Sequence, residues 1–380
     1  MRIVPTVTVL ALLGAAGCGS VSDNGPQVVS TTPMAVSPKR VEKIRDDIDG
    51  LVRGGTTGVI ATLTENGQTV TLTAGVADRI TRAPIPMAPP QQVRVGSISK
   101  TFAATIIMQL VSEGKVGLDE PVDTYLPGLL RGDGVDGRVI TVRQILQHRS
   151  GLPEMSKDPE LDVVRAAATG RTVTPGEEIA IALRRPAQFA PGERFKYTNT
   201  NFIVAGMLVE KVTGRMYSDE LAGRITTPGG LPDTYLPGPG EVGFRGSHPQ
   251  GYAMVGETPT DVTRSEPSIA WSAGGLISTG NDLNRFFMAL LAGKIVADAQ
   301  LREMLTVQPH SADAPYDYAL GIGSVRLSCG AEYFGHVGSI AGFTTVSGAT
   351  RDGRAVTVAI NETTDREPDF TDLLGDALCP

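Results

Sequence analysis

The chain is poor in the features that mark metal sites, nucleic-acid surfaces and membrane spans. It has three cysteines and four histidines, all far apart, and neither Cys-x-x-Cys nor His-Glu-x-x-His occurs, so no local pattern supports a metal site. No run of lysine and arginine exceeds a pair, and the net charge is −7, which argues against nucleic-acid binding. We therefore expect no metal, no cofactor and no nucleic-acid partner. The composition, 41% hydrophobic and 20% charged over 380 residues, permits a sizeable globular core.

The first 18 residues have the pattern of an export signal. Arg2 precedes an apolar stretch at residues 7–13 that is too short to span a bilayer, and small residues then lead to Cys18. This ending resembles a bacterial lipoprotein signal, so we expect export with a lipid on Cys18 that anchors the protein to the cell membrane. Simple secretion is the alternative. Residues 19–38 are rich in Ser, Thr, Pro, Asn and Gly, which predicts a flexible tether.

Export has a consequence for the remaining two cysteines. Cys329 and Cys379 would lie in an oxidising compartment, where a pair of cysteines is expected to form a disulfide. Two free, buried thiols are the alternative.

The hydrophobic patterns divide residues 39–380 into two kinds of segment. Both ends indicate helices with antiparallel strands: an amphipathic helix at 40–53, a hairpin at 59–76, and strands followed by a last helix between 318 and 378. The middle indicates helices and loops. The simplest assembly is an α+β fold, in which an antiparallel sheet is flanked by N- and C-terminal helices and a helical region is inserted. The α/β part would cover about 39–95 and 268–380, the helical part about 96–267, and the site would lie in the crevice between them.

Three short motifs suggest what that crevice does. Ser97 lies at the start of an apolar helix, so Lys100 shares its face of the first turn, and the Ser97 amide lies where unpaired N–H groups favour developing negative charge. Each motif alone is weak, but together they supply a nucleophile, a base system and a strand to hold substrate, the requirements of acyl-enzyme chemistry without a Ser-His-Asp triad. The motifs are Ser97-Ile98-Ser99-Lys100, Tyr197-Thr198-Asn199 and His336-Val337-Gly338.

These motifs resemble those of the serine β-lactamase and penicillin-binding-protein superfamily, on the class C side. The likeness is greatest to secreted D-alanyl-D-alanine carboxypeptidases and implies a β-lactamase/DD-peptidase-like fold. It runs from about residue 58 to the C-terminus and includes residues 94–97, 124–128, 140–144, 148–152, 197–202, 272–275 and 327–330.

The resemblance assigns the catalytic roles. Ser97 would attack the carbonyl of a peptide bond or a β-lactam ring, and Lys100 and Tyr197 would act together as base and then as acid. Which of the two takes the serine proton stays open, because either a neutral amine or a phenolate could accept it.

The resemblance also assigns substrate contacts. Asn199 would orient the acyl-side amide, although it could simply cap the following helix. His336 and Gly338 would belong to a strand beside the nucleophile, and the Ser339 amide would complete an oxyanion hole with that of Ser97. Trp271 would line the cleft, with a plain core position as an equal alternative. A histidine near its reference pKa of about 6.5 predicts that hydrolysis falls below that pH as His336 gains a proton.

The implied activity is that of an exported serine D-Ala-D-Ala carboxypeptidase, a monomer acting on peptidoglycan stem peptides or acylated by β-lactams. A class C-type β-lactamase or a carboxylesterase is one alternative, and a non-turnover β-lactam or muropeptide receptor is another. One position departs from the resemblance: Gly323 stands where these carboxypeptidases have an arginine for the substrate carboxylate. We therefore expect a weak preference for free carboxylates over carboxamides.

Overall fold

The computed structural model describes residues 36–255, 258–307, 316–363 and 369–380. The expected export signal, Cys18 and most of the expected tether lie outside these residues. The predicted tether extends too far toward the C-terminus, because Val36 is buried and helix α1 (Pro38–Arg53) begins at Pro38. No helix in the described ranges has both the length and the apolar character needed to cross a bilayer.

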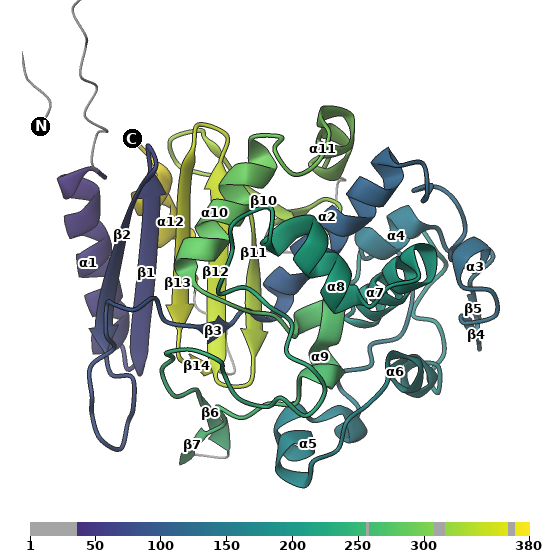
Figure 1. The fold of residues 1–380 in the computed structure, drawn as a ribbon, viewed down its shortest axis with the longest axis horizontal. Helices are drawn as coiled ribbons and strands as arrows, with labels where there is room; N and C mark the ends of the chain where they lie inside the picture. Colours follow the sequence, from purple (N-terminus) through teal and green to yellow (C-terminus); the bar gives the residue numbers. More distant parts are fainter. Residues whose placement is uncertain (1–35, 256–257, 308–315, 364–368) are drawn as a thin grey trace, which may run out of the picture. The chain divides into compact units, whose positions relative to one another are not determined.

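A seven-stranded antiparallel sheet forms one half of the molecule (Figure 1). Its strand order joins the two ends of the chain, because β1 pairs with β13 along its whole length. The order is β2 (Gln68–Gly75), β1 (Gly58–Glu65), β13 (Arg354–Ile360), β12 (Phe343–Thr350), β11 (Glu332–Ile340), β10 (Gly323–Arg326) and β9 (Asp317–Tyr318).

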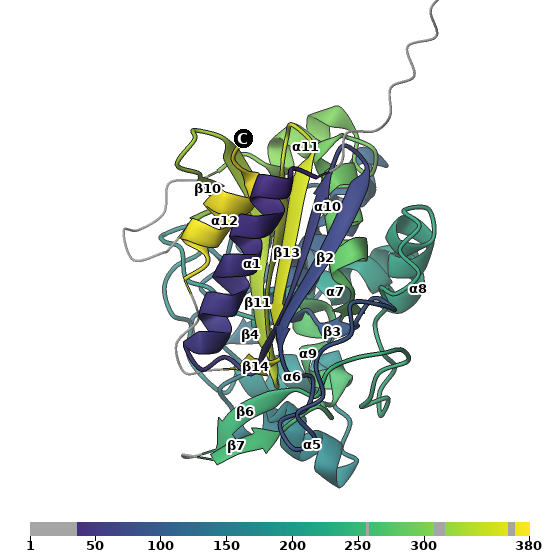
Figure 2. The same cartoon turned by 90° about the vertical axis from the view of Figure 1, so that its left-hand side faces the viewer.

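Helices cover both faces of this sheet. Helices α1 and α12 (Thr371–Leu378) lie on one face, and α10 (Gly280–Leu291) lies on the other (Figures 1 and 2). The side chains of β13 alternate accordingly: Val356 and Val358 belong to the core beneath α1 and α12, whereas Ala355 belongs to the core on the other side. The predicted α+β class, with terminal helices flanking an antiparallel sheet, is confirmed.

The inserted region is helical and carries the nucleophile at its junction with the sheet. Strand β3 (Val93–Arg94) pairs with β8 (Ile277–Ser278) and leads into a 3₁₀ turn (Gly96–Ile98) and then α2 (Ser99–Ser112). The other helices are α3 (Val122–Tyr125), α4 (Val142–Leu146), α5 (Val163–Thr169), α6 (Pro175–Ala182), α7 (Thr200–Thr213), α8 (Tyr217–Leu221), a π-turn (Ala222–Thr226), α9 (Pro267–Gly274) and α11 (Asp298–Met304). Short strands complete it: β4 (Arg131–Gly132), β5 (Val135–Asp136), β6 (Tyr252–Val255), β7 (Thr258–Asp261) and β14 (Glu362–Thr363).

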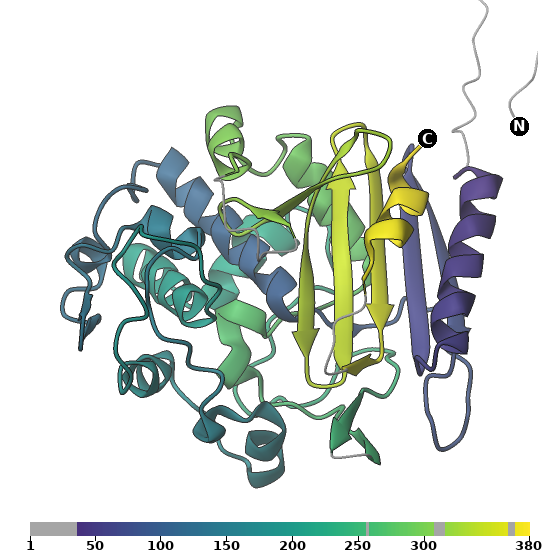
Figure 3. The same ribbon diagram turned by 180° about the vertical axis from the view of Figure 1, so that it is seen from behind.

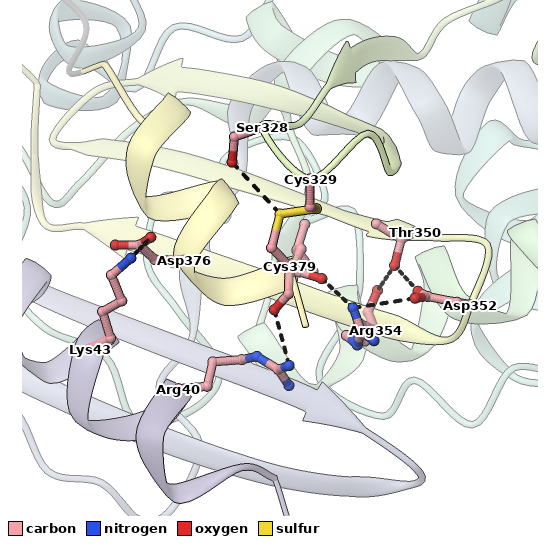
Figure 4. The surroundings of a disulfide bond; sticks show 10 residues. Arg40, Lys43, Ser328, Cys329, Thr350, Asp352, Arg354, Asp376 and Cys379 are labelled. Carbon is pink, nitrogen blue, oxygen red and sulfur yellow. Dashed lines mark hydrogen bonds and ion pairs between the residues drawn. A yellow bond between two sulfur atoms is a disulfide. The ribbon is translucent and has the colours of Figure 1, made fainter.

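A disulfide joins Cys329, which follows β10, to Cys379 at the end of α12 (Figure 4). Two arginines hold the same chain end through its carbonyls: Arg40 donates to Cys379 O at 3.1 Å and Arg354 donates to Leu378 O at 2.6 Å. The terminal helix is therefore fixed to the sheet and to α1 by one covalent and several polar links.

Removing this disulfide should destabilise the protein without changing its chemistry. The bond closes a loop of sequence separation 50, for which the loss of chain entropy in the unfolded state predicts about 2–4 kcal/mol. We expect the Cys329→Ser/Cys379→Ser variant to lose this amount in urea unfolding. A reducing agent should have no further effect on that variant. Equal unfolding free energies for oxidised wild type and variant would contradict the prediction.

Candidate active site

Two glycines bring the nucleophile turn against strand β11. A Cβ atom on Gly96, whose φ is +52°, would lie 2.8 Å from the Ser339 amide nitrogen. A Cβ on Gly338 would lie 2.8 Å from the Ser97 amide nitrogen. Only glycine permits this approach, which puts the amides of Ser97 and Ser339 beside each other. Two adjacent amides next to a nucleophile can stabilise the oxyanion of a tetrahedral intermediate.

Lys100 connects the nucleophile to two other parts of the site. Its Nζ atom donates to Asn199 Oδ1 at 2.8 Å and to the Ala273 carbonyl at 2.7 Å, and it lies 2.9 Å from Ser97 Oγ, which the lone pair of the neutral amine would face. Its side chain is fully buried, and this burial lowers the pKa of Lys100 to about 7, whereas the Glu154 carboxylate raises it. The amine is therefore neutral in a large fraction of molecules near neutral pH and can accept the serine proton.

Tyr197 lies next to Lys100 and is held by aromatic packing. The Lys100 Nζ atom lies 4.9 Å from the centre of the Tyr197 ring. On the other side the His148 imidazole stacks on that ring at 4.1 Å. His148 is fully buried and its Nδ1 accepts from the Thr198 amide at 3.2 Å. The phenol is thus positioned beside the amine, as the motif predicts, by a histidine for which the sequence indicated no such role.

Asn199 does not use its side chain to cap α7, so the capping alternative is wrong. Its Oδ1 accepts from Lys100, and its Nδ2 donates to Glu154 Oε1 at 3.3 Å and Ser156 Oγ at 3.2 Å. Its backbone amide donates to Glu154 Oε2 at 2.8 Å. Glu154 was not predicted as a site residue, since it follows the turn at 150–153 without any periodic pattern.

His336 is near the base system but is fixed as a neutral ring. Its Nδ1 donates to the Val337 carbonyl at 2.5 Å, so its Nε2 accepts from the Tyr318 hydroxyl at 3.0 Å. Burial, reinforced by the charge of Lys100, lowers the pKa of His336 to about 3. The burial and the two hydrogen bonds argue against the expectation that His336 gains a proton near pH 6.5, because a buried imidazole with both nitrogens bonded has no solvent to stabilise its cation.

The pH dependence should instead report Lys100. Because only the neutral amine can accept the Ser97 proton, kcat/KM should fall about tenfold per pH unit as the pH drops below about 7. Rates measured from pH 5 to 9 will show this limb. The His336→Gln variant should keep it at the same pH, since Gln can occupy a similar position without titrating. If the fall in kcat/KM at low pH disappears in His336→Gln, the titrating group is His336 and not Lys100.

The structure places Trp271 away from the nucleophile, which corrects its predicted position in the cleft. Its backbone is strained, with φ 31° and ψ −125° inside α9, and its ring packs edge-to-face on Tyr217 at 5.5 Å. A Cβ on Gly206 would lie 2.7 Å from the indole. Trp271 therefore packs against α7 and α8 and lines a different groove from the cleft at Ser97. Of the two positions considered for Trp271, packing between helices is therefore the one that the structure supports.

A cleft of about 470 Å³ opens from Ser97 toward the loop that follows Glu154. Asn199 and Ser339 lie on its wall, and α9 contributes small and apolar side chains rather than the tryptophan. The carboxylates of Asp158 and Asp162 also line the cleft, and neither was predicted as a site residue from the sequence. Other residues that line the cleft are Met155, Lys157, Ile269, Ala270 and Ile340. Within the described ranges there is no cluster of three or more metal-ligating side chains.

Comparison with known proteins agrees with this geometry. Residues 41–377 match the family model described as Beta-lactamase. A D-aminopeptidase from Cereibacter sphaeroides is 26% identical over 319 residues, 82% of this chain and 57% of the relative. The structure of a D-stereospecific amidohydrolase from Streptomyces sp. is 35% identical, with a TM-score of 0.81 over 89% of this chain and 98% of that chain. The structure of D-amino acid amidase from Ochrobactrum anthropi SV3 complexed with L-phenylalanine is 27% identical, with a TM-score of 0.76 over 89% and 97%.

The chain covers 57% of the length of the D-aminopeptidase and 48% of that of another curated relative, so it spans about half the length of the curated relatives it matches. The family match covers most of the chain, and the solved structures align over nearly their whole length. The resemblance on the sequence motifs is thereby confirmed. The chain belongs to the beta-lactamase family.

Proposed function

We propose that this protein is a D-stereospecific serine amidohydrolase that takes substrates with a free α-amino group. It would cleave the amide bond on the carbonyl side of a D-amino acid. The observation that carries the proposal is the Glu154 carboxylate, which is hydrogen-bonded to Asn199 on the wall of the cleft. The names of two structurally similar relatives, a D-stereospecific amidohydrolase and a D-amino acid amidase, support it.

The proposed reaction uses the groups already described. Ser97 attacks the amide carbonyl, and neutral Lys100 takes the hydroxyl proton at 2.9 Å. The amides of Ser97 and Ser339 stabilise the oxyanion. The C–N bond then breaks, the leaving nitrogen takes a proton from the Lys100–Tyr197 pair, and an ester of Ser97 with the D-amino acyl group remains. Water, deprotonated by the same pair, hydrolyses this ester.

Glu154 is suited to recognise an ammonium group. Its carboxylate accepts from the Asn199 and Ser156 amides and from Asn199 Nδ2. These partners carry no charge, so they orient the carboxylate without neutralising it, and its effect on the pKa of Lys100 shows that its field reaches the base. An α-ammonium at the acyl end of the cleft would therefore gain a charge-assisted hydrogen bond.

A D-Ala-D-Ala carboxypeptidase is the finer function that the motifs suggested, and it requires a cation for the substrate's terminal carboxylate. Gly323 supplies no side chain, and a Cβ there would already lie 2.9 Å from the Tyr316 ring. This favours a substrate without a free carboxylate. We retain export and a lipid on Cys18 as proposals, which the pattern of residues 2–18 supports.

The test compares substrates that differ only at the amino group. We expect the wild type to hydrolyse D-alaninamide faster than L-alaninamide and faster than N-acetyl-D-alaninamide. Glu154→Gln should lower kcat/KM for D-alaninamide by about ten- to hundredfold, the worth of a hydrogen bond between charged groups. The rate on the acetylated amide should change much less.

The matched control is Glu160→Gln, the same change at an exposed residue that pairs with Arg184. It should leave both rates unchanged. A wild type that prefers acetylated D-alanyl-D-alanine and releases D-alanine would overturn the amidohydrolase proposal and restore the carboxypeptidase. Rapid turnover of penicillin without amide hydrolysis would instead identify a β-lactamase.

A further inference from the structure

A second cavity, of about 360 Å³, is lined by residues of β10, β11 and α12. Figure 3 shows α12 on this face of the sheet. It is separate from the cleft described above and shares none of its lining residues. Its walls are mostly aliphatic and aromatic. We call it the β10–β11 cavity; it is lined by Tyr316, Gly323, Val325, Tyr333, Gly335, His336, Val337, Val346, Asp369, Phe370, Thr371 and Leu374.

The cavity exists because two glycines face each other across the strands. Gly323 of β10 pairs directly with Gly335 of β11, so neither strand fills this part of the surface. The Tyr316 ring lies over Gly323, and the Tyr333 hydroxyl lies over Gly335, where Cβ atoms would come within 2.9 and 2.2 Å respectively. The Tyr333 hydroxyl is buried and has no hydrogen-bond partner among the described residues. A buried donor without a partner costs about 1–3 kcal/mol, which a ligand with an acceptor would recover.

The cavity is adjacent to the reacting atoms. His336 and Val337 line it, and the next two residues, Gly338 and Ser339, pack against the nucleophile turn. Since a strand rises about 3.4 Å per residue, the wall at Val337 is about 7 Å from Ser339. Val337 packs against the core on the α12 side, whereas a Cβ on Gly338 would meet the Ser97 amide, so these two residues face opposite sides of β11. Beyond Gly335 no described strand pairs with β11 on its β10 side, so a group bound beside Ser339 would reach the cavity around this edge.

The positions of the proton donors decide which part of a substrate points this way. Tyr197 lies 6.3 Å from His336 between ring centres, and Lys100 lies beside Tyr197. Lys100 bonds Asn199 at 2.8 Å, so Tyr197 is the member of the pair that lies toward His336. With Tyr197 as the donor to the leaving nitrogen, the leaving group departs on the His336 side. The acyl group occupies the other side, toward Asn199 and Glu154.

We propose that the β10–β11 cavity receives an uncharged, apolar leaving group, such as an aromatic amine or the side chain of a second hydrophobic residue. This rests on the proposed amidohydrolase function. No lysine or arginine is among the described residues that line the cavity, and Asp369 adds a carboxylate, so a free carboxylate on the leaving group is disfavoured. In the step itself the C–N bond breaks, the amine takes a proton from the Lys100–Tyr197 pair, and the acyl group stays on Ser97.

The test fills the cavity from an exposed position. Thr371 lies in the first turn of α12, is exposed and lines the cavity, whereas its exposed neighbour Asp372 does not. In Thr371→Trp we expect kcat/KM for D-alanine anilide to fall at least about tenfold relative to D-alaninamide. Asp372→Trp should leave this ratio at the wild-type value. An unchanged ratio in a folded, active Thr371→Trp variant would overturn the proposal.

Two further measurements keep the outcomes distinct. Val325→Phe fills the same cavity from β10 and should give the same fall in the ratio if Thr371→Trp does not fold. Phenyl acetate and methyl acetate differ in the leaving group but contain no D-amino acid. The ratio of kcat/KM for phenyl acetate to that for methyl acetate should fall in both Thr371→Trp and Val325→Phe. Because neither ester contains a D-amino acid, this result does not depend on whether Glu154 recognises an amino group. Equal ratios with both substrate pairs would assign the cavity no part in leaving-group selection.

Discussion

Ser97→Ala is expected to abolish acylation and to lower hydrolysis by at least about 10⁴-fold, the effect of removing a nucleophile that acts with its base as one unit. Ser97 provides the hydroxyl that Lys100 contacts at 2.9 Å, beside the paired amides of Ser97 and Ser339. Loss of one oxygen atom at the wall of an open cleft should not disturb packing. Intact mass after incubation with penicillin, and ammonia release from D-alaninamide, measure the two effects.

The matched control lies two residues away in the same motif. Ser99 Oγ donates to the Gly96 carbonyl at 2.7 Å and accepts from the Leu276 amide at 3.2 Å, both in the buried interior. Ser99→Ala should therefore lower stability by about 1–3 kcal/mol, because it leaves a buried amide and carbonyl unpaired. It should still acquire the mass of one penicillin. A covalent adduct on Ser97→Ala would exclude Ser97 as the nucleophile.

Local sequence patterns predicted the regular elements well where one face is buried. The amphipathic stretch at 40–53 is α1, which extends only two residues further toward the N-terminus. Asn66 and Gly67 both have positive φ, as a two-residue hairpin turn between β1 and β2 requires. Such features depend on short-range periodicity and turn chemistry, which a single sequence contains.

Elements fixed by tertiary contacts were harder to predict. The pattern of residues 318–325 predicts a single strand, but in the structure this stretch is divided between β9 and β10. The break is at Gly321, whose φ is +70° and whose carbonyl accepts from Thr101 of α2. Its amide donates to Leu146 O. These partners are distant in the sequence, so no local pattern announces the interruption.

In the candidate site, too, local features could be predicted from the sequence, whereas features fixed by tertiary contacts could not. Motif spacing identified Ser97 and Lys100 because one helical turn brings them together regardless of the rest of the fold. The side of α9 from which Trp271 projects depends on a strained backbone that composition cannot reveal. Glu154 is part of the site only because a loop places it behind Asn199, and the neutral state of His336 follows from burial. Burial and loop geometry are properties of the folded chain.

Lys100→Met should lower kcat/KM by about 10²–10⁴-fold, the usual contribution of a general base, and should remove the acid limb of the pH profile. Methionine keeps the length and most of the volume of the buried stem but has no amine to accept the Ser97 proton. Asn199 Oδ1 and the Ala273 carbonyl lose their donor, and the Ser97 hydroxyl loses its acceptor. Thermal unfolding will show whether their loss or the removal of a buried amine dominates stability.

The companion variant Tyr197→Phe separates the two members of the base system. It keeps the ring that stacks on His148 at 4.1 Å and packs beneath Lys100, and removes only the hydroxyl. If neutral Lys100 takes the serine proton, Tyr197→Phe should retain the acid limb near pH 7 while its rate falls, because the limb belongs to the amine. A limb that survives in Lys100→Met but disappears in Tyr197→Phe would make the phenolate the base. In that case the lowered pKa of Lys100 would serve the later proton transfers to the leaving nitrogen.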